Sequence, residues 1–376
     1  MDTTASVAPP YVVKPFRLSP FTALMLAPSG VGDPASARAF ARPYAEVPGR
    51  LREWQNSGRI QRDSTPALYL HEYTAAGVTI RGLVGKLDLS RTSAACPDAQ
   101  QAVFPHEGVH AEQVSELADR MHEMGINPAP ILLVHRGPEA LRELVHGILS
   151  SPPDWSFSDR AEQLHRMWAL RDPGLLAGIA VELSDTRALI ADGHHRYAAY
   201  LRLQEASPGS PWDHGLAMLV DQSDTPLWLG PIHRFLPGRR LVDVVAACEG
   251  NPDLDCRLTS RNEALDRLGD RTLVLTDDED WATLTLPASD PLAVMALDNL
   301  LLPFLGVDKR TVSFHHTAES ALAQARAHAG TCILMPIPAF DAVADAAGAG
   351  ILLPEKATSF QPKPSLGVLM RSLHDG

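Results

Sequence analysis

Apolar and polar positions alternate along this chain in two different periods. Two apolar-rich runs at 67–73 and 78–87 predict two strands, joined by a hairpin turn at 74–77. A helical period predicts one amphipathic helix over 110–124 that ends at Gly125, with an apolar stripe of Val114, Leu117, Ala118, Met121 and Met124. The other patterns in the first 240 residues predict a helix over 38–54, strands at 130–135, 188–191 and 215–220, and helices beginning at 173 and 194.

The same alternation continues in the last third of the chain, beyond a Pro-Gly-Arg-Arg segment at 237–240. Helices and strands are predicted there at 241–249, 272–276, 281–286, 291–302, 317–328, 332–336 and 338–346. The whole pattern predicts an α/β (mixed α+β) protein in three parts. These are an N-terminal segment over 1–95 that adds strands to the core, the core itself over 96–238, and a C-terminal α/β domain over 239–376.

Composition and charge narrow the class of protein. The 376 residues carry a formal net charge of −12, which argues against a broad basic surface, so no nucleic-acid partner is expected. The four cysteines form no C-x-x-C pair, and this spacing predicts reduced thiols. No basic segment followed by an apolar run opens the sequence, and no stretch approaches the roughly 20 apolar residues of a membrane span. We therefore expect a cytoplasmic protein without a membrane partner.

The first candidate site is the segment from Asp192 to Arg196, where a predicted strand runs through Gly193 directly into a helix. Backbone N–H groups at a helix start favour anions, and a glycine lets a ligand approach them closely. Arg196 adds a planar fork suited to phosphate, and His194 and His195 can donate hydrogen bonds or move a proton. Asp192 is a candidate Mg²⁺ ligand. The segment predicts a phosphate site, with a helix cap on a solvated turn as the alternative.

The second candidate is the segment from Pro105 to His110, which contains the string His106-Glu107-x-x-His110. Zinc hydrolases use this string when both histidines lie on one face of a helix. Here Pro105 precedes the string, Gly108 interrupts it, and the helical stripe begins only afterwards. We therefore expect a strand-to-helix connection with Glu107 as a site carboxylate, and zinc hydrolysis is the third-ranked function.

Weaker candidates lie further along the chain. The Pro-bounded loop at 353–363 contains two lysines that could reach a phosphate, with a solvated loop as the alternative, and Lys356 is predicted to fold back onto the Asp192 turn. Lys356, His233 and Arg234 are the residues that could border a second site. His315 and His316 follow a short apolar run and are expected to be a polar strand end.

These motifs resemble a known superfamily. The segment from Asp192 to Arg196, followed by two alanines, is similar to the nucleotide-binding motif of the ParB and sulfiredoxin superfamily, and its two histidines resemble the form found in free-serine kinases. Across nearly the whole chain, the layout resembles the domain-of-unknown-function 1015 family. The supporting residues are Pro15-Phe16-Arg17, Pro66-Ala67-Leu68-Tyr69, His106-Glu107, Met167-Trp168, Asp192–Arg196, Pro354-Glu355-Lys356, Phe360 and Pro362-Lys363.

The resemblance implies a ParB/sulfiredoxin-like nucleotide-binding core and a kinase that uses ATP or ADP with Mg²⁺. Its acceptor would be a hydroxylated amino acid such as free L-serine. The implied catalytic residues are Glu107, Asp192 and His195, and the implied phosphate-binding residues are His106, Gly193, His194 and Arg196. A non-catalytic nucleotide-binding switch is the alternative, and a homodimer is compatible with either function. Relative to compact serine kinases, about 50 residues are inserted between Val134 and Ala188.

Overall fold

The computed structural model describes residues 6–39, 44–249, 251–287 and 289–374. The chain divides into two compact units, of which unit 1 comprises Met1–Leu227 with Pro362–Gly376 and unit 2 comprises Trp228–Gln361. The two units differ from the three predicted parts. Unit 1 includes the first 227 residues, and the division falls at residue 228 rather than at residue 239. The last 15 residues of the chain also belong to unit 1, because β23 (Met370–Ser372) pairs with β3 (Ala23–Leu26) and β9 (Ile126–Asn127).

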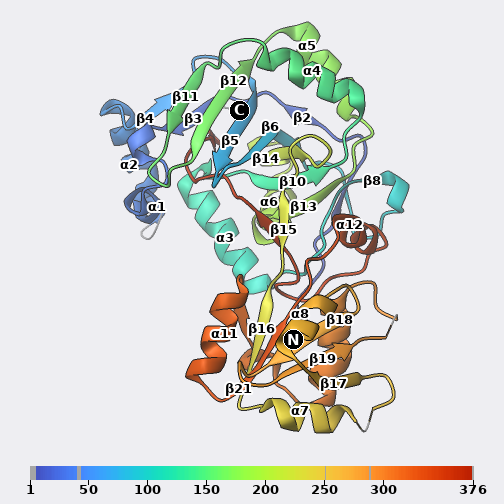
Figure 1. The fold of residues 1–376 in the computed structure, drawn as a ribbon. Coiled ribbons are helices and arrows are strands. Elements are labelled where there is room, and N and C mark those ends of the chain that lie inside the picture. The colour runs from blue at the N-terminus through green and yellow to red at the C-terminus, as the bar shows by residue number, and fades with distance from the viewer. Residues whose placement is uncertain (1–5, 40–43, 250, 288, 375–376) are drawn as a thin grey trace. The chain divides into compact units, whose positions relative to one another are not determined.

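Unit 1 is built on a long mixed sheet (Figure 1). Within the described residues its strand order is β11-β12-β5-β6-β14-β10-β13-β8-β1-β7, and β2 also pairs with β6. These strands are β1 (Tyr11–Val13), β2 (Leu18–Ser19), β5 (Leu68–Ala75), β6 (Val78–Asp88), β7 (Thr92–Ser93), β8 (Gln101–Phe104), β10 (Ile131–His135), β11 (Trp155–Ser158), β12 (Leu164–Leu170), β13 (Ala188–Asp192) and β14 (His214–Asp221). A smaller sheet has the order β4-β3-β23-β9, with β4 at Ile60–Arg62.

The helices of unit 1 are α1 (Pro34–Ala39), α2 (Val47–Asn56), α3 (Ala111–Met124), α4 (Glu139–Leu149), α5 (Pro173–Leu183) and α6 (His194–Ala206). The predicted helix over 38–54 is realised in part as α2, and its residues 40–43 lie outside the described residues. Helix α3 ends as predicted, because Gly125 takes the left-handed conformation at φ 65°. Helix α5 begins where the Asp172 side chain accepts a hydrogen bond from the backbone N–H of Leu175 at 2.8 Å.

Local sequence explains the predicted hairpin. Strands β5 and β6 pair in antiparallel register from Tyr69 opposite Val84 to Ala75 opposite Val78. The two-residue turn places Ala76 and Gly77 at positive φ, the backbone shape that suits a tight hairpin. The inserted region between 135 and 187 forms α4, β11, β12 and α5, and β12 extends the sheet by pairing with β5.

Unit 2 contains a six-stranded sheet in the order β17-β19-β18-β21-β16-β20 and a two-stranded pair, β15-β22. Its strands are β15 (Trp228–Gly230), β16 (His233–Pro237), β17 (Asp255–Thr259), β18 (Thr272–Thr276), β19 (Trp281–Thr285), β20 (Ser313–His315), β21 (Gly330–Leu334) and β22 (Ser359–Gln361). Its helices are α7 (Leu241–Cys248), α8 (Arg261–Arg267), α9 (Ala293–Ala296), α10 (Leu302–Phe304), α11 (Ala318–Ala327) and α12 (Phe340–Gly348). Side chains of β18, β21, α8 and α11 form one hydrophobic cluster.

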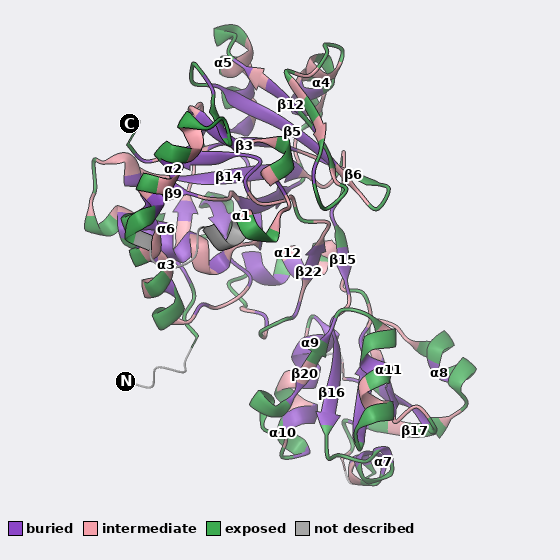
Figure 2. Cartoon of the chain, turned by 90° about the vertical axis from the view of Figure 1, so that its left-hand side faces the viewer, coloured by how far each residue is buried: buried purple, intermediate pink, exposed green. Residues whose placement is uncertain are grey.

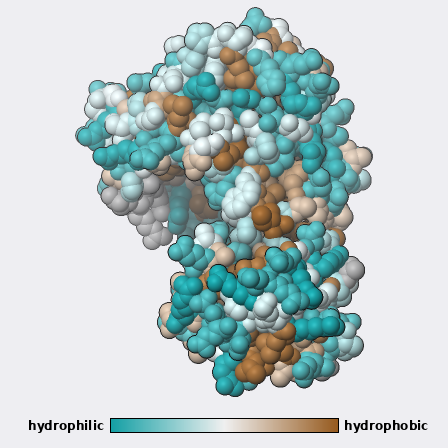
Figure 3. All heavy atoms as spheres, viewed as in Figure 1, coloured by the Kyte–Doolittle hydropathy of each residue, from teal (hydrophilic) through white to brown (hydrophobic). Residues whose placement is uncertain are grey.

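The predicted mixed α/β class is confirmed. The central strands of the main sheet are buried, whereas α4 and α5 expose their outer sides (Figure 2). Hydrophilic residues cover most of the face drawn in Figure 3, and hydrophobic residues there form small separate groups. In the part of the chain that the structure describes, no helix combines the length and the apolar character needed to cross a membrane.

Candidate functional site

Two adjacent parallel strands bring the two candidate segments together. Strand β13 pairs in parallel with β8, with Ala188 opposite Val103 and Leu189 opposite Phe104. Parallel neighbours end at the same edge of a sheet, so the connection that follows β8 and the turn that follows β13 lie side by side. The first connection carries Glu107 and the second carries Asp192, which places both candidate carboxylates at one sheet edge.

Gly193 makes the turn from β13 into α6. It is the residue before the first turn of the helix, with φ 97° and ψ 31°, a backbone conformation that side chains rarely adopt. A β-carbon at this position would lie 2.9 Å from Nη2 of Arg196. The missing side chain therefore allows the guanidinium to fold back over the turn. Helix α6 has 13 residues and begins at His194, so its first backbone N–H groups are those of the predicted phosphate site.

The Arg196 guanidinium is held by acceptors of the protein itself. Its Nη2 donates to Oδ2 of Asp192 at 2.6 Å, and its Nη1 donates to the carbonyl oxygens of Pro130 at 2.6 Å and Ala129 at 3.3 Å. The side chains of Asp192 and Arg196 are 28% and 23% exposed, so the pair lies at the surface of the site. In this arrangement Arg196 fixes the position of Asp192 and ties the turn to the residues before β10.

His194 connects the two segments. Its Nε2 accepts a hydrogen bond from the backbone N–H of His106 at 3.4 Å, so in the neutral ring Nδ1 carries the proton. That Nδ1 lies 3.8 Å from Oε2 of Glu107, whose side chain is one quarter exposed. Burial, followed by the charges of His106, His195 and Lys363, holds the pKa of His194 well below 6.5. His194 is therefore a neutral ring that lies beside Glu107 rather than a cation.

His106 is completely buried and packs edge-to-face on His194, with ring centres 4.5 Å apart. Burial lowers the pKa of His106 to about 4, and a hydrogen bond with the backbone of Ile190 opposes this shift. His195 points to a different neighbour, because its Nε2 accepts from the backbone N–H of His110 at 3.2 Å. The two adjacent histidines thus hold opposite ends of the connection that carries Glu107.

The position of helix α3 contradicts the zinc-hydrolase hypothesis. That chemistry needs His106 and His110 one turn apart on a helix, but α3 begins at Ala111, after both residues. Among the described residues, no group of three or more His, Cys, Asp and Glu side chains is arranged to hold a metal ion. The expected strand-to-helix connection is what the structure has.

Lys363, which was not among the predicted site residues, contacts the carboxylate of Asp192. The Lys363 ammonium donates to Oδ1 of Asp192, while Arg196 occupies Oδ2. Lys363 belongs to the same Pro-bounded loop as Lys356, which was the lysine expected at this turn. Nothing in the spacing of two lysines seven residues apart separates one from the other, so sequence reasoning could name the segment but not the residue.

The three predicted second-site residues meet in unit 2. Arg234 is 1% exposed and donates to the carbonyl oxygens of Ile232 at 2.5 Å and Lys356 at 2.9 Å. His233 is also buried, and its Nδ1 accepts from the backbone N–H of Met335 at 3.0 Å. Through these hydrogen bonds, Arg234 and His233 hold the backbone of neighbouring segments in place. A second ligand site at these residues stays a prediction.

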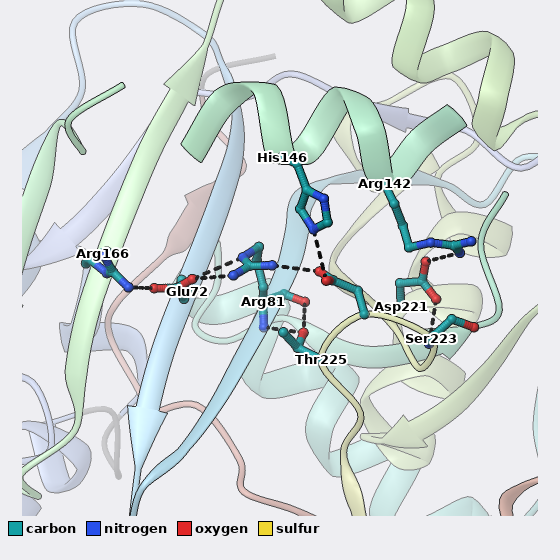
Figure 4. Close-up of polar contacts among 9 residues, drawn as sticks. Glu72, Arg81, Arg142, His146, Arg166, Asp221, Ser223 and Thr225 are labelled. Carbon is teal, nitrogen blue, oxygen red and sulfur yellow. Dashed lines mark hydrogen bonds and ion pairs between the residues drawn. The ribbon is translucent and has the colours of Figure 1, made fainter. Parts of the chain in front are cut away.

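A second charged cluster in unit 1 balances its own charge (Figure 4). Glu72 is 2% exposed, accepts two hydrogen bonds from Arg81 at 2.8 and 3.0 Å, and also pairs with Arg166. Arg81 in turn donates to Asp224 at 2.7 Å, and His146 contacts the other oxygen of Asp224 at 3.1 Å. Because alternating charges cancel along this chain of contacts, we interpret it as a stabilising network between strands and α4, not as a ligand site.

Residues 16–300 match the family described as protein of unknown function (DUF1015), and this chain belongs to that family. The match confirms the family resemblance seen in the sequence. Comparison with proteins of curated function found no match.

Three solved structures are similar to this chain at low identity. A free serine kinase in complex with AMP is 16% identical, with 71% of this chain and 88% of that chain covered and a TM-score of 0.40. A conserved hypothetical protein from Pyrococcus furiosus is 15% identical, with 73% and 93% covered and a TM-score of 0.40. C-terminally truncated SbnI from Staphylococcus aureus is 10% identical, with 73% and 85% covered and a TM-score of 0.41.

Proposed function

We propose that this protein is a small-molecule kinase that transfers a phosphoryl group from ATP or ADP to a hydroxylated amino acid, with free L-serine as the first candidate. The observation that carries the proposal is the juxtaposition of Glu107 with the Asp192–Arg196 turn at one sheet edge, with His194 in contact with the Glu107 segment. The nucleotide and the acceptor are inferred from the resemblance of this turn to the motif of the free-serine kinases.

Phosphoryl transfer requires positioning and charge stabilisation more than covalent help from the protein. The first N–H groups of α6 favour phosphate oxygens, and the Arg196 guanidinium lies over Gly193 beside them. The acceptor hydroxyl oxygen would form a bond to the terminal phosphorus while the bond from that phosphorus to the leaving nucleotide oxygen breaks. Glu107 is the proposed acceptor of the hydroxyl proton, because its carboxylate is one quarter exposed and lies 3.8 Å from Nδ1 of His194 at the start of α6.

The residues present fit Mg²⁺ only in part. Asp192 offers carboxylate oxygens of the kind that Mg²⁺ prefers, and a nucleotide-bound Mg²⁺ commonly takes one or two carboxylates together with phosphate oxygens. Asp192 would therefore be the protein ligand, and bound Mg²⁺ would offset negative charge on the phosphates. Arg196 keeps the Asp192 carboxylate in place through Oδ2.

The test is mass spectrometry of the full chain incubated with Mg²⁺, ATP or ADP, and a pool of amino acids that includes L-serine. The proposal expects one phosphorylated amino acid to accumulate while the nucleotide loses one phosphate. Nucleotide binding without any phosphorylated product would contradict the kinase and would support the nucleotide-binding switch. Absence of nucleotide binding would contradict both functions.

A further inference from the structure

The chain returns to the site through a short strap, residues 362–365, which is the first segment of unit 1 after unit 2. Three hydrogen bonds fix its backbone. The Tyr73 hydroxyl donates to the carbonyl of Pro362 at 2.7 Å, the Gln163 amide donates to the carbonyl of Lys363 at 3.0 Å, and the backbone N–H of Ser365 donates to Oε1 of Gln163 at 3.2 Å. Tyr73 thus holds the strap before Lys363, and Gln163 holds it at Lys363 and Ser365.

The partners of the strap are themselves rigidly placed. Tyr73 is fully buried in β5. The Asp159 carboxylate accepts from the backbone N–H groups of Ala161 and Gln163 at 2.8 and 2.9 Å, and its other oxygen contacts the completely buried ring of His165 at 3.2 Å. Asp159 and His165, which are buried, therefore anchor the turn that carries Gln163, although Ala161 and Glu162 within the turn are exposed. The strap is tied at two main-chain carbonyls and one N–H, and none of these bonds involves the Lys363 side chain.

The two cations on Asp192 differ in how firmly they are bound. Arg196 makes hydrogen bonds to three acceptors, whereas the Lys363 side chain is 48% exposed and its ammonium contacts Oδ1 of Asp192. An ion pair that is half exposed contributes little free energy, so its ammonium can exchange one anionic partner for another. Lys363 also carries one of the charges that lower the pKa of His194, the ring that lies beside Glu107.

We propose that Lys363 is the residue that binds the terminal phosphate of the nucleotide, and that its ammonium moves from Asp192 to that phosphate when the nucleotide arrives. The inference rests on the proposed kinase function. Exchange of partners leaves Oδ1 of Asp192 available to Mg²⁺ only when a phosphate has taken the ammonium. Lys363 then distinguishes ADP and ATP from AMP, and Gln163 is a positioning residue that acts through it.

Calorimetric titration of the full chain with AMP, ADP and ATP in the presence of Mg²⁺ tests the role of Lys363. Lys363→Met removes the ammonium but leaves every main-chain anchor of the strap. Loss of one charge-assisted hydrogen bond is expected to weaken ADP or ATP binding about 10-fold or more while AMP affinity changes less than about 2-fold. Lys363→Arg should recover part of the loss. Lys309→Met is the matched control, because Lys309 is an exposed lysine paired with Asp298 at 2.9 Å in unit 2.

Equal loss of AMP and ATP affinity in Lys363→Met, or no loss of either, overturns the role of Lys363 while the kinase proposal stands if the wild-type chain still makes product. A wild-type chain that binds no nucleotide removes the proposed function and this inference together.

A double-mutant cycle tests the role of Gln163. Gln163→Leu removes both hydrogen bonds to the strap but keeps the ammonium, and we expect a several-fold loss of ATP affinity with unchanged AMP affinity. In the Lys363→Met background the same change should have no further effect on ATP affinity, because the strap then has no ammonium to place. Independent, additive losses would show a general structural role for Gln163 and would overturn the positioning claim.

Discussion

Gly193→Ala is the sharpest test of the geometry at the start of α6. A non-glycine residue in the left-handed conformation costs about 1–2 kcal/mol. The added β-carbon would also lie 2.9 Å from Nη2 of Arg196, so the guanidinium has to move away from Asp192 and from the Pro130 carbonyl. Because the Arg196 side chain is 23% exposed, we assign about 1 kcal/mol to this second effect rather than the value for a buried ion pair.

Gly209→Ala is the matched control for that variant. Gly209 also has a positive φ, at 74°, but a β-carbon there would meet nothing within 4 Å. Both variants carry the cost of the backbone conformation, and only Gly193→Ala displaces Arg196. Urea unfolding should therefore show losses of about 2–3 kcal/mol for Gly193→Ala and about 1–2 kcal/mol for Gly209→Ala. Nucleotide affinity should fall only in the first. Equal destabilisation with unchanged nucleotide affinity would refute the described role of the turn.

Two further predictions concern buried charge and pH. Glu72→Gln leaves Arg81 and Arg166 facing a neutral amide, and urea unfolding should show a loss of about 2–3 kcal/mol, reduced from the value for a fully buried pair because Arg166 is 46% exposed. Glu116→Gln, which breaks an exposed pair on α3, should change stability by less than about 1 kcal/mol, and similar losses in both variants would contradict the network described for Glu72. The pKa of His106 is about 4 in the folded chain, against the ordinary histidine value of 6.5 in the unfolded chain, so below pH 6.5 the unfolded chain binds a proton that the folded chain does not. This residue therefore lowers stability by up to about 3 kcal/mol as the pH falls from 6.5 to 4 and has no effect above that range. In His106→Asn, the free energy of unfolding should therefore fall less steeply between pH 6.5 and pH 4, because one fewer proton is taken up on unfolding. A slope equal to that of the wild-type chain would show that His106 titrates normally.

Sequence periodicity predicted the elements whose shape depends on near neighbours. The β5–β6 hairpin and the end of α3 at Gly125 follow from turn residues and from positions three or four apart. It could not predict that β12 pairs with β5, nor that β23 returns to β3, because these pairings join residues about 90 to 350 positions apart and leave no local pattern. This is also why the division into two units differs from the three predicted parts.

The same distinction applies to the site. The strand, glycine and helix around Gly193 are continuous in sequence, and the turn was found there directly. The approach of Glu107 to His194 depends on the parallel pairing of β8 with β13, which the sequence did not predict; the family resemblance implied only that Glu107 and Asp192 serve one site. Lys363 reaches Asp192 because Gln163 and Tyr73, which lie 200 and 289 positions from the strap residues they bind, hold the strap, so composition could not select it over Lys356.

The central claim is that the two carboxylates at this sheet edge serve phosphoryl transfer. The most direct measurement is the initial rate of phosphorylated amino acid formation with Mg²⁺ and saturating nucleotide, in wild type, Glu107→Gln and Asp192→Asn. Glu112→Gln is the matched control, because Glu112 is an exposed carboxylate in the first turn of α3, five residues after Glu107. We predict a rate loss of about 100-fold or more in the first two variants and an unchanged rate in the third. Product formation at the wild-type rate in Glu107→Gln and Asp192→Asn would contradict the account.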